Sequence, residues 1–166
     1  MHAHPDWVVL NRGIDGQRTD QILARFERDV VEEGPDYVII LGGVNDIFQG
    51  VALDNVKGNL RIVYEKAISA GIRAIAASVL PYNTTTDTEA DAIRDVNVWI
   101  ENTAQALGIL FCDTNKAVAD PKDRKRLLSS PDGYHPDVLG YRSMGEILGK
   151  TITTDLMRRE PVRTRG

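Results

Sequence analysis

Three short polar segments contain the residues best suited to chemistry: Asn11–Gln17, Gly42–Asp46 and Asp132–Pro136. Asp132 and His135 stand three residues apart in a predicted turn, so the carboxylate can accept a hydrogen bond from one ring nitrogen of His135. That contact would fix the tautomer and leave the other ring nitrogen free as a general base. The same spacing also fits a turn aspartate followed by a surface histidine, so both interpretations stay open.

Asn45 and Gly16 are candidates for stabilising negative charge. Asn45 follows two glycines, where the backbone can approach a ligand closely, and its side-chain amide can donate a hydrogen bond to an oxyanion. Gly16 can supply a backbone N–H to the same point. Taken one at a time, these residues also fit ordinary turn formers.

The elements that must position these segments follow from the hydrophobic pattern. Short β-branched apolar runs alternate with longer segments of helical period, which predicts an α/β fold with a parallel sheet covered by helices on both faces. Strands are predicted at residues 7–10, 37–41, 72–79 and 109–112, and helices from about 19, 54, 92 and 136. Ligands of such sheets bind outside the carboxyl ends of the strands, where Gly16 and Asn45 fall.

Composition limits the class of protein. The 166 residues fit one domain, with a core at 7–157 and a flexible tail at 158–166, and the 42% hydrophobic content excludes general disorder. A net charge of −4 without a basic stripe argues against nucleic acid as a partner. No apolar stretch approaches the roughly 20 residues that cross a bilayer, and the first residues are no signal peptide, so we expect a cytoplasmic protein.

Neither a metal nor an organic cofactor is expected. Cys112 is the only cysteine, which excludes an intramolecular disulfide and multi-cysteine metal sites, and its apolar run favours a core position. His2 and His4 could bind a metal together with Asp6, but a mobile N-terminus is the favoured interpretation.

Together the three segments resemble the SGNH hydrolase family, also called GDSL esterases and lipases. The resemblance assigns Gly16 and Asn45 to the oxyanion hole, His135 to the general base and Asp132 to the orientation of His135. It implies a three-layer, flavodoxin-like α/β/α fold and serine-type hydrolysis of small-molecule carboxylic esters. The loops after the strands are short, which favours small or short-chain acyl groups, including acetyl groups on sugars.

One family block is missing. The Gly-Asp-Ser that carries the nucleophile at the end of the family's first strand does not occur, and no serine precedes Gly16. None of the five serines is expected to replace it. Either the chain is a shortened member, which could also have lost a signal peptide, or it is an inactive variant that binds acylated ligands. The retained Asp132, His135, Asn45 and Gly16 favour shortening.

The missing block also implies a missing strand. In the flavodoxin-like strand order 2-1-3-4-5, that strand would lie between residues 7–10 and 37–41. Direct closure of these two strands, or an unfilled and poorly stable sheet, is expected ahead of a strand donated by a second chain. A homo-oligomer therefore stays open.

Overall fold

A parallel sheet of three strands forms the centre of the computed structural model, which describes residues 6–159. The strands are β1 (Tyr37–Ile40), β2 (Arg73–Ala77) and β3 (Leu110–Cys112), in that spatial order. Tyr37 pairs with Arg73, and Ile75 pairs with Leu110. The predicted α/β fold with a parallel sheet flanked by helices is confirmed, and each apolar run from residue 37 onward contains a strand.

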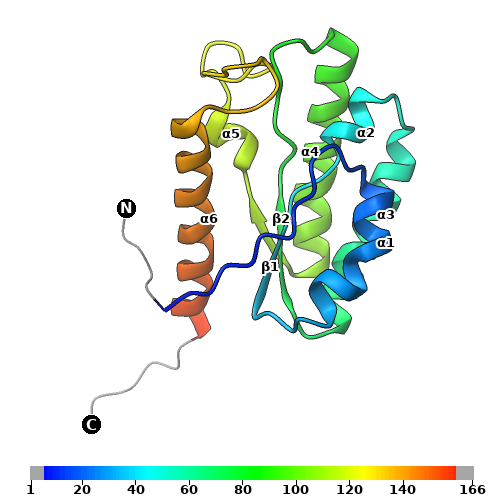
Figure 1. The fold of residues 1–166 in the computed structure, drawn as a ribbon, viewed down its shortest axis with the longest axis vertical. Coiled ribbons are helices and arrows are strands. Elements are labelled where there is room, and N and C mark those ends of the chain that lie inside the picture. The colour runs from blue at the N-terminus through cyan, green and yellow to red at the C-terminus, as the bar shows by residue number, and fades with distance from the viewer. Residues whose placement is uncertain (1–5, 160–166) are drawn as a thin grey trace.

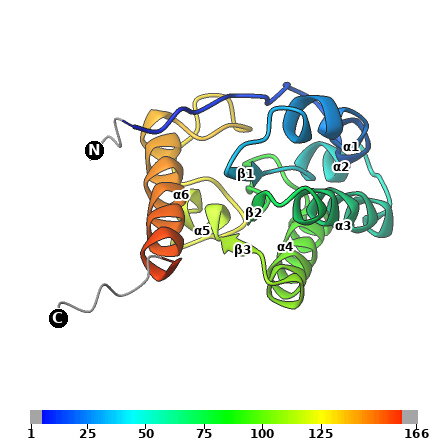
Figure 2. The same ribbon diagram turned by 90° about the horizontal axis from the view of Figure 1, so that it is seen from below.

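Helices cover both faces of the sheet (Figures 1 and 2). On one face lie α3 (Leu53–Ser69) and α4 (Asp87–Leu107), and the helix α1 (Thr19–Phe26), continued by the π-helix η1 (Glu27–Val31), packs on α3. On the other face lie α5 (Thr114–Val118) and α6 (Val138–Arg159). A five-residue helix, α2 (Val44–Phe48), follows β1 directly. This short helix carries Asn45 and was not predicted.

The main core lies between the sheet and the α3–α4 layer. Val56, Leu60, Val63 and Tyr64 of α3 are at most 1% exposed, and they share a cluster with residues of α4 and the sheet. The helix α4 begins with a capping box in which Thr86 and Glu89 exchange hydrogen bonds, and it ends at Gly108 with a left-handed backbone. Cys112 is buried, as predicted.

The predicted first strand does not form. Residues 7–10 are not part of the sheet, so direct closure onto β1 does not occur. Of the two expected arrangements, the described sheet has the unfilled one, with β1 as an edge strand. Val8, Val9 and Leu10 are 88%, 80% and 56% exposed. A strand needs a neighbour to supply its hydrogen bonds, and apolar, β-branched residues alone do not provide one.

The last helix begins two residues after its predicted start, and few of its residues are buried. Of its 22 residues, Met144 and Asp155 are buried. Its C-terminal end is tied to the sheet, because Asp155 accepts hydrogen bonds from Tyr37 and Arg73 at the starts of β1 and β2. The predicted tail from residue 158 begins inside α6, and residues 160–166 lie outside the described part of the chain, as do His2 and His4.

Candidate active site

The loop before α6 holds His135 against Asp132. The ring Nδ1 of His135 lies 2.7 Å from Oδ2 of Asp132, so the hydrogen bond expected from their spacing is present. Since a carboxylate only accepts, Nδ1 carries the proton and the lone pair of Nε2 is free to take another. Both side chains are about half exposed. This geometry suits a general base oriented by a carboxylate.

Backbone contacts fix the turn that presents this pair. Oδ1 of Asp132 accepts hydrogen bonds from the backbone N–H groups of Tyr134 and His135, each at 2.8 Å. Ser130 Oγ accepts from Gly133 N–H and donates to the carbonyl of His135. Gly133 has φ +83°, a conformation that favours glycine. The sequence Ser-Pro-Asp-Gly-Tyr-His therefore folds into one defined loop.

These contacts also set the charge of Asp132. The hydrogen bond from the His135 ring, reinforced by the two backbone N–H groups, lowers the pKa of Asp132 well below its usual value. Asp132 is consequently ionised at neutral pH. A fixed negative charge next to Nδ1 is what a histidine needs when its ring gains a proton during catalysis.

Asn45 sits in the first turn of α2, behind two glycines. Gly43 has φ +116°, a backbone conformation that favours glycine, and a Cβ on Gly42 would require the end of the Ile22 side chain to shift. The Asn45 side-chain amide donates one hydrogen bond, of 3.0 Å, to the carbonyl of Gln17. Because an amide nitrogen carries two protons, this contact orients the group and leaves a second N–H for a ligand.

A buried carboxylate that the sequence analysis did not single out joins Asn45 to the Gly16 segment. Asp46 is 1% exposed and accepts hydrogen bonds from both the backbone N–H and the hydroxyl of Thr19, the first residue of α1. A carboxylate at a helix N-terminus is also favoured by the helix dipole. Gly16 itself is exposed, with φ +73°, three residues before this anchor. Because Asp46 directly follows Asn45 in the sequence, that adjacency could have marked Asp46 as part of the candidate site.

The α2 segment and the histidine loop meet through aromatic rings. Phe48, one turn after Asn45, lies edge-on to Tyr134, which directly precedes His135, with ring centroids 6.1 Å apart. Both rings also contact Tyr82, which follows β2. The contact of Gln17 with Asn45 thus joins the first two polar segments, and the contact of Phe48 with Tyr134 joins α2, the helix that carries Asn45, to the third.

The five serines are all engaged or remote from the His135 ring. Ser78 is 1% exposed and bonded to Asp113 and to the backbone of Asn115. Ser130 is held by the loop backbone, and Ser143 donates to a carbonyl of its own helix. Ser69 lies at the end of α3, at the other end of the molecule (Figure 1), and the Ser129 side chain forms a hydrogen bond with Asp137. The structure thus gives no serine an evident nucleophilic position.

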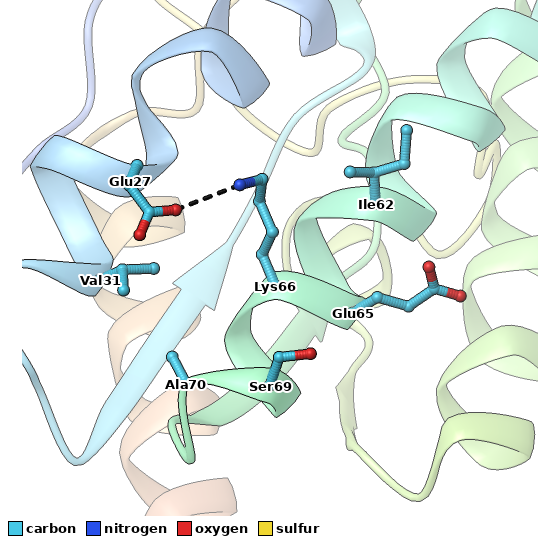
Figure 3. Close-up of a pocket in the computed structure, with 7 residues that line it drawn as sticks. All are labelled: Glu27, Val31, Ile62, Glu65, Lys66, Ser69 and Ala70. Carbon is cyan, nitrogen blue, oxygen red and sulfur yellow. Dashed lines mark hydrogen bonds and ion pairs between the residues drawn. The ribbon is translucent and has the colours of Figure 1, made fainter.

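Two hollows of the described molecule lie away from the candidate site. A groove of about 420 Å³ lies between η1 and the end of α3, where Lys66 forms an ion pair with Glu27 (Figure 3). A second, of about 650 Å³, lies between β3 and α6. Neither groove is lined by His135 or Asn45.

Within residues 6–159 no group of three or more histidine, cysteine or acidic side chains is arranged to hold a metal. None of the helices in that range has the length and apolar character needed to cross a bilayer.

Comparison with known proteins identifies the relatives of this arrangement. The profile of the GDSL-like Lipase/Acylhydrolase family matches residues 2–143. An acetylxylan esterase from Geobacillus stearothermophilus is 26% identical over 167 residues, which cover 90% of this chain and 74% of the esterase. The structure of a GDSL-like lipase from Bacteroides thetaiotaomicron VPI-5482 superposes with a TM-score of 0.81 at 30% identity, covering 87% of this chain and 75% of the lipase. The crystal structure of the acetylxylan esterase Axe2 from Geobacillus stearothermophilus shares the fold, with a TM-score of 0.73 at 23% identity over 87% of this chain and 71% of Axe2.

Proposed function

Because the chain belongs to the GDSL-like lipase/acylhydrolase family, we propose that it supplies the general base and the oxyanion hole of a serine-type carboxylic ester hydrolase. Its substrates are small or short-chain acyl esters, including acetyl esters of sugars. The observation that carries the proposal is the 2.7 Å contact between His135 and Asp132, in a loop joined by aromatic contact to the helix that bears Asn45.

The proposed reaction gives each residue one role. A serine hydroxyl attacks the acyl carbon while Nε2 of His135 takes its proton, and Asp132 stabilises the imidazolium that forms. The side-chain amide of Asn45 and the backbone N–H of Gly16 donate to the oxyanion. His135 then gives the proton to the departing alcohol, and water repeats the sequence to release the acid. No metal or organic cofactor takes part.

The nucleophile is supplied by a strand that is not among residues 6–159. Two features support this placement: β1 has an open outer edge, and the serines of the chain are occupied or remote. A strand beside β1 that runs parallel to it would end at the same edge as Asn45. Its last residue would therefore face the groups that act on it.

Short acyl groups are favoured by the connections around this edge. The connections after β1 and β2 that lie outside helices are residues 41–43, 49–52 and 78–86. They offer little chain for a lid or an acyl tunnel. The acetylxylan esterase relative supports acetyl esters as substrates.

The alternative is a protein that binds acylated ligands without cleaving them. This alternative is favoured by the lack of an available serine among the described residues. Hydrolysis of p-nitrophenyl acetate by this chain, and by a version extended at its N-terminus with a Gly-Asp-Ser strand, separates the two. We expect turnover in the extended version alone. A matched extension with alanine in place of the serine should be inactive. Absence of turnover in a folded extended version would favour the binding protein.

A further inference from the structure

The aromatic cluster of Phe48, Tyr82 and Tyr134 borders the candidate site and is only partly needed for packing. Tyr82 is buried, at 2% exposed, whereas Phe48 and Tyr134 are 55% and 46% exposed. Tyr134 stacks on Tyr82 with an angle of 23° between the rings, and Phe48 stands edge-on to both. Because burial of apolar surface is favourable, the exposed parts of these two rings offer apolar surface to a ligand.

The surrounding chain holds these rings in place. Tyr134 lies in the loop fixed by Asp132, and the carbonyl of Gly133 accepts a 2.6 Å hydrogen bond from the backbone N–H of Asn83. Asn83 in turn accepts through its side chain from Leu127 N–H. Phe48 ends α2, whose first turn is anchored by Asp46. The exposed rings are therefore fixed in position, which lowers the entropic cost of binding a ligand against them.

Polar groups flank the apolar surface. On one side, Gln49 follows Phe48 and accepts a hydrogen bond from the guanidinium of Arg18. On the other side lies the exposed Thr84, whose Cγ2 methyl is the part nearest to Gly133 and whose hydroxyl belongs to the same exposed side chain. The surface thus has an aromatic centre and hydrogen-bonding groups at its border. Such a combination suits a ligand with an apolar face and a polar rim.

We propose that Phe48 and Tyr134 bind the pyranose ring of a sugar ester, with the C–H face of the sugar against the aromatic rings and its hydroxyl groups toward the polar border. This inference rests on the proposed function, because it places the ester next to His135. Phe48 and Tyr134 would then determine specificity without taking part in the chemical step.

Binding of xylotetraose to the chain as it stands tests this inference, because binding needs no nucleophile. We expect saturable shifts of the Phe48 and Tyr134 ring signals in NMR titrations. Phe48→Ala and Tyr134→Ala should each weaken binding by about fivefold to tenfold, the range expected for one aromatic contact. Phe48→Leu, which keeps much of the volume but lacks the ring, should weaken it similarly, and Tyr134→Phe should retain it.

The matched control is Tyr141→Ala, which removes an aromatic ring of similar exposure from α6. This variant should bind like the parent chain. Absence of saturable binding, or equal affinities of Tyr134→Ala and Tyr141→Ala, would overturn the inference. The binding test is independent of hydrolysis. If the extended version cleaves p-nitrophenyl acetate but Phe48→Ala does not weaken sugar binding, the sugar site is refuted and the hydrolase proposal stands. Sugar binding that depends on Phe48 and Tyr134 without turnover in any version refutes the hydrolase alone.

Discussion

The two faces of β1 differ sharply in how well they are covered. Val38 and Ile40 point toward the α3 layer, where Ile40 is 5% exposed within the main core. Side chains alternate along a strand, and Tyr37 reaches Asp155 of α6, so Ile39 faces the α6 layer. Ile39 is nevertheless 43% exposed. One side of the strand is packed as a protein interior, and the other is largely open.

The open side extends beyond β1. Exposed apolar side chains also occur in the N-terminal segment, in the residue after β1 and in α6; they include Val8, Val9, Leu10, Leu41, Val138, Leu139 and Met157. Figure 2 shows the N-terminal segment passing from α6 to α1 beside the β1 edge. The strand proposed beside β1 would cover exposed apolar side chains of β1 and of the N-terminal segment. The candidate site spans both regions, because Asn45 belongs to the packed one and His135 to the loop that leads into α6.

The largest expected effect concerns the base that the open region presents. In the extended, active version, His135→Ala should lower kcat/KM for p-nitrophenyl acetate by about 10³-fold or more, because a base, its carboxylate and the nucleophile act as one unit. Steady-state kinetics with circular dichroism as a folding control measures this. A loss below tenfold in a folded variant would remove His135 from catalysis.

Matched leucine truncations in the two regions should differ in their cost to stability. Leu60 is 1% exposed in the packed core, and Leu60→Ala should lower the free energy of unfolding by about 2–5 kcal/mol. Leu10 is 56% exposed, and Leu10→Ala should change it by no more than about 0.5 kcal/mol. Urea denaturation of both variants makes the comparison.

The same two substitutions, Leu10→Ala and Leu60→Ala, can be compared in the extended version by their effects on the unfolding free energy. A strand that fills the open edge would bury Leu10, so Leu10→Ala should become clearly destabilising there while the cost of Leu60→Ala stays the same. If Leu10→Ala remains neutral in a stable extended version, the added strand does not pack between residues 7–10 and β1.

The contrast between the regions also explains what could be predicted from the sequence. Residues 37–41 are apolar at every position, and residues 37–40 pair with β2, so the predicted strand forms. Residues 7–10 have a similar pattern, but no described strand lies beside them, and pattern alone cannot supply a partner. Asp132 and His135 are close in sequence, so their contact could be predicted locally. The contact of Phe48 with Tyr134 joins distant segments and depends on the whole fold.

Asp46 connects the packed region to the Gly16 segment, and its removal should have an intermediate effect. Asp46→Ala leaves the N–H and hydroxyl of Thr19 without their acceptor at a buried position, which should cost about 1–3 kcal/mol in unfolding free energy. Amide exchange should also quicken around residues 16–20. The exposed Asp54, in the first turn of α3, provides the control. Asp54→Ala should leave both the unfolding free energy and the amide exchange at residues 16–20 unchanged. Unchanged exchange at residues 16–20 would mean that Asp46 does not position Gly16.

The smallest expected effect is a change in the pH response of the histidine loop. The hydrogen bond from the His135 ring is the largest cause of the lowered pKa of Asp132, and the backbone N–H groups of residues 134 and 135 add to it. Because the folded loop favours the ionised carboxyl, its stabilisation is present above the usual aspartate pKa and is lost as pH falls through the lowered value. The carboxyl ¹³C shift of Asp132 should therefore stay constant between pH 7 and 4. In His135→Ala the ring is gone but both backbone donors remain, so the pKa of Asp132 should rise and still lie below its usual value. If Asp132 titrates identically in the parent chain and in this variant, the His135 ring does not lower the pKa of Asp132. The proposed role of Asp132 in orienting His135 would then be wrong.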